Sequence, residues 1–127
     1  DEYDWIYISM GMSRGALPGV DERHRLELVM YSQEQRPELA NTLAKLVMYP
    51  FVHGTGFAPG DTIPGAQEGV VPGSPLTDIL LTPVYFEAEG FDHIAHQDGT
   101  HTHLLWATPI YPQERAYIRK FGWRRLV

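Results

Sequence analysis

The sequence predicts an α+β fold, with a mostly antiparallel β-sheet and helices packed on one face. Two strand-like segments precede a long amphipathic helix, and two more precede a second helix at the end of the chain. This order is typical of α+β domains rather than of alternating α/β proteins. The chain has 127 residues, 43% of them hydrophobic and 20% charged, which suits one domain with a hydrophobic core.

The first two predicted strands lie near the beginning of the chain. Aromatic and β-branched residues dominate Tyr3–Met10, and apolar residues alternate with other types over Arg23–Ser32. Residues 14–21, between them, hold two glycines and one proline and therefore predict a loop. Two strands joined by a single loop predict an antiparallel pair.

The segment Gln33–Val52 contains the longer predicted helix. Leu39, Leu43 and Leu46 follow the three- and four-residue spacing of one buried helix face. Pro50 predicts either the end of this helix or a kink, because proline has no N–H to donate and its ring collides with the preceding turn.

The middle of the chain, His53–Ser74, is rich in glycine and proline and predicts a long loop. A loop of this length inside a compact domain is usually functional, and the alternative is a poorly ordered connector. A strand is predicted from about Ile79 to Glu87, and Pro83 within it indicates a sheet edge or a bulge. Residues 90–100 are polar.

The last quarter of the chain predicts a strand, a turn and a helix. The strand is His101–Ile110, and Pro109 and Pro112 restrict the turn that follows it. Pro112 suits a first helical turn, and Glu114 lies near the positive end of the helix dipole. Gly122 is a typical residue for the end of such a helix.

Charge and composition bear on several classes of protein. The net charge of −6 disfavours a nucleic-acid-binding protein and is compatible with a basic protein partner, although acidic charge can also serve solubility alone. No apolar segment approaches the roughly 20 residues of a membrane-spanning helix. The chain has no cysteine and begins with acidic residues instead of a signal peptide, which suits a cytoplasmic protein whose upstream segment is missing.

Four of the six histidines lie close together in the sequence. His101 and His103 are two residues apart, so on a strand they share one face. His93 and His96 precede them and can approach from the preceding turn. Four imidazoles can bind zinc or nickel, and the alternative is a solvated histidine-rich hairpin. A metal-binding domain, or a metal-dependent enzyme, is therefore the second functional hypothesis.

A second group of polar residues, Glu87, Glu89 and Asp92, follows the predicted strand at Ile79–Glu87. Two carboxylates on one face can act in acid–base chemistry or hold a hard cation, and the alternative is a solvated acidic strand end. The sequence has no cysteine nucleophile, no GxSxG elbow and no phosphate-binding loop with a GKS or GKT motif. It therefore offers no positive support for an enzyme.

The ordered segments resemble the suppressor of fused (SUFU-like) family, of the bacterial type. The resemblance covers almost the whole chain, and Asp61 stands where the family pattern has a histidine. It implies a single SUFU-like domain over residues 1–127, without the helix and strand that usually open the domain. The segments that carry it are YISMGMS (7–13), RLELVMY (25–31), LAKLVMYPF (43–51), GDTIPG (60–65), LLTPVYF (80–86) and LLWATPIYPQERAYIRKFGWRRLV (104–127).

The resemblance implies a non-enzymatic protein-binding domain without a cofactor. Bacterial members look like immunity proteins of polymorphic toxin systems, which neutralise a toxin by binding it. A basic toxin domain would suit the acidic charge, and no nucleic acid or membrane is expected as a partner. Exposure and acidity, not the family, suggest a set of partner-binding residues. They are Phe57, Asp61, Thr62, Glu87, Glu89 and Asp92.

Overall fold

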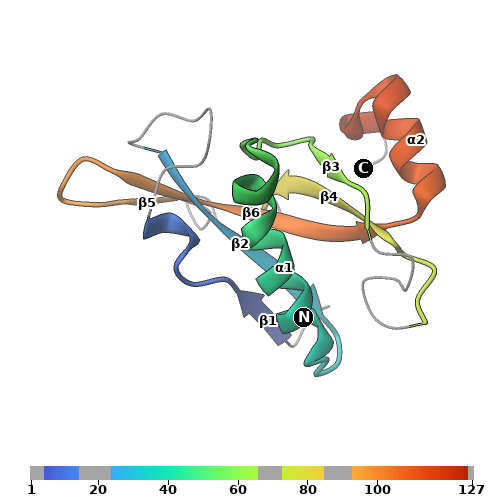
Figure 1. Ribbon diagram of the computed structural model, residues 1–127, viewed down its shortest axis with the longest axis horizontal. Coiled ribbons are helices and arrows are strands. Elements are labelled where there is room, and N and C mark those ends of the chain that lie inside the picture. Colours follow the sequence, from blue (N-terminus) through green and yellow to red (C-terminus); the bar gives the residue numbers. More distant parts are fainter. Residues whose placement is uncertain (1–4, 15–23, 66–72, 85–92, 126–127) are drawn as a thin grey trace.

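Strand β6 (His101–Ile110) is the longest strand of the computed structural model and runs through the middle of its sheet (Figure 1). The structure describes residues 5–14, 24–65, 73–84 and 93–125. Within them the other strands are β1 (Trp5–Ile8), β2 (His24–Ser32), β3 (Thr62–Ile63), β4 (Asp78–Pro83) and β5 (His93–Ala95). The helices are α1 (Glu38–His53) and α2 (Pro112–Phe121), with 3₁₀ turns at Met12–Arg14 and Trp123–Arg125.

The sheet has the strand order β1-β2-β6-β4-β3, and β5 pairs with the first part of β6. Strands β1 and β2, β3 and β4, β4 and β6, and β5 and β6 pair antiparallel, whereas β2 and β6 run parallel. The predicted α+β class and mostly antiparallel sheet are therefore confirmed. So is the antiparallel pairing of the first two strands, which aligns Tyr7 with Met30.

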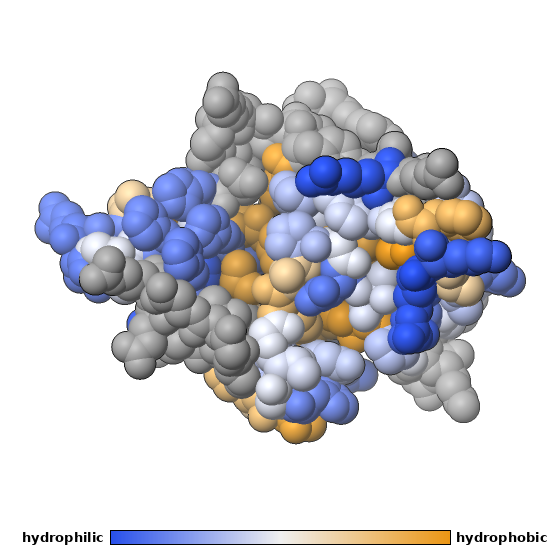
Figure 2. Space-filling model, turned by 90° about the horizontal axis from the view of Figure 1, so that it is seen from above, coloured by the Kyte–Doolittle hydropathy of each residue, from blue (hydrophilic) through white to orange (hydrophobic). Residues whose placement is uncertain are grey.

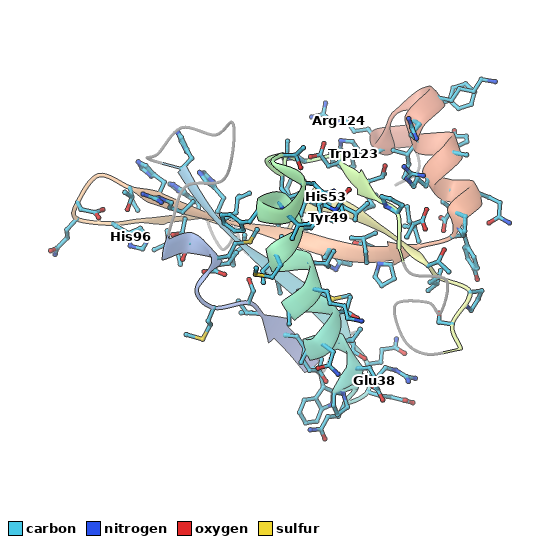
Figure 3. All side chains as sticks on the ribbon, viewed as in Figure 1. Glu38, Tyr49, His53, His96, Trp123 and Arg124 are labelled. Atoms are coloured by element: carbon cyan, nitrogen blue, oxygen red, sulfur yellow. The ribbon has the colours of Figure 1, made fainter. Side chains whose placement is uncertain are left out.

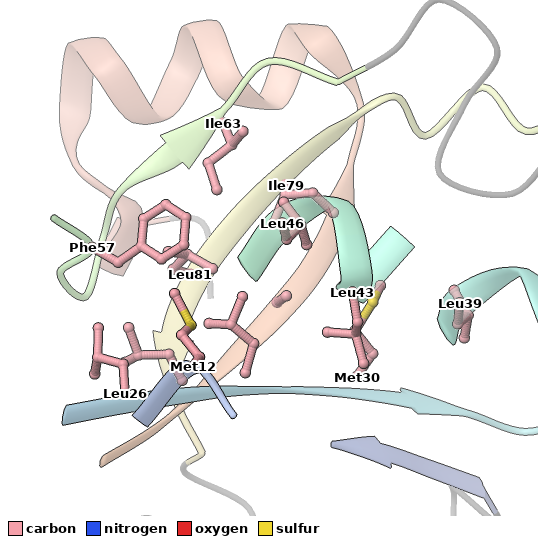
Figure 4. Close-up of a cluster of buried hydrophobic side chains, with 13 residues drawn as sticks. Met12, Leu26, Met30, Leu39, Leu43, Leu46, Phe57, Ile63, Ile79 and Leu81 are labelled. Carbon is pink, nitrogen blue, oxygen red and sulfur yellow. The ribbon is translucent and has the colours of Figure 1, made fainter. Parts of the chain in front are cut away.

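Helix α1 covers one face of the sheet and closes the main hydrophobic core (Figure 4). Leu39, Leu43 and Leu46 are buried, as their spacing predicted. They pack with Leu28 and Leu81, neither of which has any solvent-exposed surface. Burying such side chains is the main force that holds the helix on the sheet, at about 1.5–3 kcal/mol for each one.

Helix α2 packs on the other face, which corrects the expectation that both helices share one side. Its buried residue Ile118 contacts Leu80 and Ile110, whereas the neighbours Ile79 and Leu81 belong to the core under α1. Successive side chains of a strand point to opposite faces, so β4 holds the two helices on opposite sides. The apolar stripe of α2 did not reveal which face of the sheet it would meet.

The ends of several elements differ from the prediction. Helix α1 begins at Glu38, inside the segment Gln33–Val52 that was predicted to contain it. It passes through Pro50 and ends at His53, with Gly54 as its C-cap. Pro50 lies in the last turn, where it has no N–H to donate to the carbonyl of Leu46 but its own carbonyl still accepts the N–H of Gly54.

Pro83 ends β4 and pairs in regular register with Leu105 of β6, so it is not in a bulge. Strand β3 pairs only with Ile79 and Leu80, so on its other side Pro83 lies beyond the paired part of the sheet, as an edge position requires.

Two short strands lie where the sequence predicted no strand. Strand β3 falls within the glycine- and proline-rich segment, and β5 falls within the polar segment before β6. No helix among the described residues is long and apolar enough to cross a membrane.

Candidate functional site

An apolar cavity of about 270 Å³ lies between the turn that follows α1 and the beginning of β6. Its walls come from β2, the end of β4, β6 and that turn. Such a cavity suits an apolar side chain or a small apolar ligand, because most of its lining is aliphatic or aromatic. The lining residues are His24, Leu26, Phe57, Ala58, Pro59, Pro83, His103, Leu104 and Leu105.

The turn at Phe57–Asp61 is held by hydrogen bonds at both of its ends. The N–H of Ala58 donates to Oδ2 of Asp61 at 2.9 Å, and the N–H of Gly60 donates to the carbonyl of Leu81 at 2.7 Å. The N–H of Leu81 donates back to the carbonyl of Asp61 at 2.9 Å. The turn is therefore an extension of the sheet edge, and it holds one wall of the cavity in a fixed position.

Three of the residues predicted to bind a partner belong to this region. Phe57 is only 7% exposed and packs in the main core, so one side of its ring supports the fold. Asp61 is half-buried and caps the turn, and Thr62 pairs with Leu80 in β3. The other three predicted residues, Glu87, Glu89 and Asp92, lie outside the described residues.

Besides His24 on β2, the exposed residues that line the cavity are Ala58 and Pro59. The sequence predicted Phe57, Asp61 and Thr62 as partner-binding residues but not Ala58 or Pro59, because neither of the latter carries charge or a reactive group. The one sequence signal for this site was Phe57 itself. A large hydrophobic residue in a glycine- and proline-rich loop indicates that the loop packs against the core.

The structure gathers four histidines on one side of the sheet beside this cavity. His93, His101 and His103 lie together as predicted, and His24 from β2 joins them. His96 does not, since its Nε2 lies 2.7 Å from Oγ1 of Thr102. Thr102 alternates with His101 and His103 along β6, so it points to the opposite face.

His24 was missed because it is far from the other histidines in the sequence. The parallel pairing of β2 with β6 places it opposite His101. A parallel pair requires a long connection, and no local pattern in the sequence specifies its register. The alignment of the two strands could not be predicted from the histidine spacing.

A second polar network supports the turn between β1 and the 3₁₀ turn at Met12–Arg14. The carboxylate of Glu27, only 7% exposed, accepts hydrogen bonds from Ser9 Oγ at 2.7 Å and from the N–H groups of Gly11 and Ser13 at 3.1 and 2.9 Å. Three donors compensate for burying the carboxylate. The role of Glu27 is structural, and it explains why the Gly-Met-Ser segment adopts this turn.

The turn between β5 and β6 lowers the pKa of the carboxyl group of Asp98. The hydroxyl and the N–H of Thr100 both donate to Oδ1 of Asp98, at 2.6 and 3.0 Å. These bonds favour the ionised carboxylate and lower the pKa of Asp98. The two bonds from Thr100 hold the hairpin turn in place, and the nearby His96 also favours the ionised carboxylate.

Comparison with solved structures defines the fold as that of suppressor of fused proteins. A crystal structure of a candidate SUFU homologue from Neisseria gonorrhoeae FA 1090 has a TM-score of 0.73 and 22% identity to this chain, and matches 96% of it. The Sufu–Fu complex has a TM-score of 0.73 and 19% sequence identity, and the match covers 94% of this chain. Drosophila Suppressor of Fused has a TM-score of 0.66 and 18% sequence identity, and the match covers 90% of this chain. The chain spans 59%, 58% and 31% of these three structures, respectively.

The sequence itself agrees with the structural likeness. The family model for suppressor of fused protein (SUFU) matches residues 2–127. The chain therefore belongs to the SUFU family. Among curated proteins, no sequence matches it significantly.

Proposed function

We propose that this chain is a non-enzymatic protein-binding domain, and that it acts as a bacterial immunity protein that neutralises a toxin by binding it. The observation that carries the proposal is the apolar cavity beside the Phe57–Asp61 turn. It suits an apolar side chain of a protein partner, because buried anchors in such pockets supply much of the binding free energy of an interface.

Two further observations support a protein partner. A SUFU protein has been crystallised in the Sufu–Fu complex, so the fold is compatible with binding a protein. The net charge of this chain is −6, which favours encounter with a basic partner. A basic toxin domain agrees with both observations, because it is a protein and its charge is opposite to that of this chain. An immunity protein would bind such a toxin in the cytoplasm.

The first test is affinity capture from the source cells with the whole chain as bait, in low and high salt. The matched variants are Ala58→Arg, which places a large cation beside the cavity, and Ala44→Arg on the exposed side of α1. We expect a basic protein to be captured by the parent and by Ala44→Arg, and to be lost with Ala58→Arg. Capture by all three would show that the cavity is not the binding site.

The second test separates immunity from protein binding in general. The captured protein is expressed in a bacterial host with and without this chain, and growth is measured. We expect expression alone to stop growth and co-expression to restore it. A captured partner that is harmless when expressed alone would leave the protein-binding domain standing and overturn the immunity role.

A further inference from the structure

Four histidine rings from three strands stand on one face of the sheet. His24 lies opposite His101, and His93 lies opposite His103, as cross-strand partners. Paired residues point to the same face, and so do residues two apart along one strand. The hairpin β5–β6 and the beginning of β2 thus present the four rings together, at the end of the molecule where hydrophilic residues cover much of the surface (at the left in Figure 2).

The four rings form a closed set of neighbours. The ring centroids are 5.3 Å apart for His24 and His103, 4.9 Å for His103 and His93, 5.0 Å for His93 and His101, and 5.9 Å for His101 and His24. Two pairs also meet through their nitrogens. His24 Nδ1 lies 3.2 Å from His103 Nε2, and His93 Nε2 lies 2.8 Å from His101 Nδ1.

We propose that His24, His93, His101 and His103 bind a divalent transition metal of the zinc, nickel or cobalt type. Zinc–nitrogen bonds are about 2.0–2.1 Å long, so two nitrogens on a tetrahedral ion lie about 3.3–3.4 Å apart. The 3.2 Å between His24 and His103 already approaches that separation. A set made only of imidazoles suits these metals and not calcium or magnesium, which prefer oxygen.

Binding requires side chains to rotate but leaves the backbone in place. Among the described residues no three potential ligands surround a common point, so the rings as they stand contact one another and not a shared centre. His24 and His93 are exposed, so their rings have room to change rotamer, whereas His101 and His103 are half-buried and would move less. The paired strands hold the four backbone positions, and the ion replaces nitrogen-to-nitrogen contacts with metal bonds.

The test is a calorimetric titration of the untagged, EDTA-treated chain with zinc, and an absorption titration with cobalt. We expect saturable binding of one ion per chain, the visible absorption of tetrahedral cobalt, and a rise in melting temperature with zinc. Magnesium should give none of these. Circular dichroism checks that each variant is folded.

Two double variants, His24→Gln/His103→Gln and His93→Gln/His101→Gln, remove one half of the cluster each. We expect either one to weaken zinc binding at least tenfold. The matched control is His96→Gln, whose ring is on the same hairpin but contacts Thr102 (Figure 3), and it should bind zinc as the parent does. No saturable zinc binding by the parent, or a zinc affinity equal to the parent's in both double variants, would overturn the proposal. Neither result depends on a protein partner.

Discussion

A Cβ atom added to Gly60 would lie 2.5 Å from Cδ1 of Trp123. Gly60 also has a φ of +93°, which residues with a side chain rarely adopt. Its N–H is bonded to the carbonyl of Leu81 at 2.7 Å, so the backbone has little freedom to move away. The turn beside the cavity is therefore fixed by β4 on one side and by Trp123, just after α2, on the other.

Replacing Gly60 with alanine tests this contact. We expect Gly60→Ala to lower the free energy of unfolding by about 2–6 kcal/mol, because the positive φ and the displaced Trp123 each cost of order 1–3 kcal/mol. Gly99→Ala is the matched control, since Gly99 has a φ of +88° and nothing within 4 Å of an added Cβ. Urea denaturation measures both, and equal losses would contradict the role of Trp123.

The buried carboxylate of Glu27 gives a second prediction. In Glu27→Gln one of the two acceptor oxygens becomes an NH₂ group. If the remaining carbonyl oxygen keeps the N–H groups of Gly11 and Ser13, the NH₂ group faces Ser9 Oγ, whose hydroxyl can no longer donate to this side chain. We expect a loss of about 1–3 kcal/mol in the free energy of unfolding, the cost of a buried polar group left unpaired. The control is Glu34→Gln, an exposed carboxylate near Arg36, which should change stability by less than about 1 kcal/mol. Similar losses in both variants would refute the buried network.

Elements with a strong local pattern were predictable from the sequence. The leucine spacing of α1 identified its buried face, and Pro112, Glu114 and Gly122 marked the ends of α2. In the structure Glu114 accepts the N–H of Tyr111 at 2.9 Å, and the N–H of Gly122 donates to Ile118 at 2.8 Å. These signals are local, because they depend on atoms within one helical turn.

The arrangement of the strands was much less predictable. The parallel pairing of β2 with β6 is long-range, and it brings His24 to the other histidines. Strand β3 has two residues, too few for a pattern of alternation. Phe57 seemed to be a surface contact because a glycine-rich loop surrounds it, yet the loop folds back and buries it. Predicting the candidate site therefore required tertiary contacts that local patterns do not contain.

The burial of Phe57 leads to a third prediction. We expect Phe57→Ala to lower the free energy of unfolding by about 3–5 kcal/mol, the usual cost of removing a buried phenylalanine. Phe51→Ala is the matched control, because Phe51 is 48% exposed on α1 and should cost about 1 kcal/mol or less. Chemical denaturation compares them. A small loss in Phe57→Ala would mean that the ring does not support the core.

Folding must be preserved before Phe57 is tested as a partner contact. Phe57→Leu keeps most of the buried volume and is the better variant for binding experiments. If Phe57→Leu remains folded and captures the partner as the parent does, the ring itself is not required for recognition. Loss of capture in that folded variant would support the predicted contact.

The last prediction concerns the pKa of Asp98. The Thr100 hydroxyl is the main cause of its lowered pKa, so Thr100→Val should raise that pKa toward the usual value for aspartate. A lowered folded-state pKa contributes stability above the unfolded pKa, and this contribution disappears as the pH falls through the folded pKa. The variant should therefore be less stable than the parent near neutral pH, and the difference should shrink in acid. Carboxyl-carbon NMR titration measures the pKa, with Thr55→Val as a control on another exposed threonine. An unchanged Asp98 pKa in Thr100→Val would show that the 2.6 Å hydrogen bond does not set it.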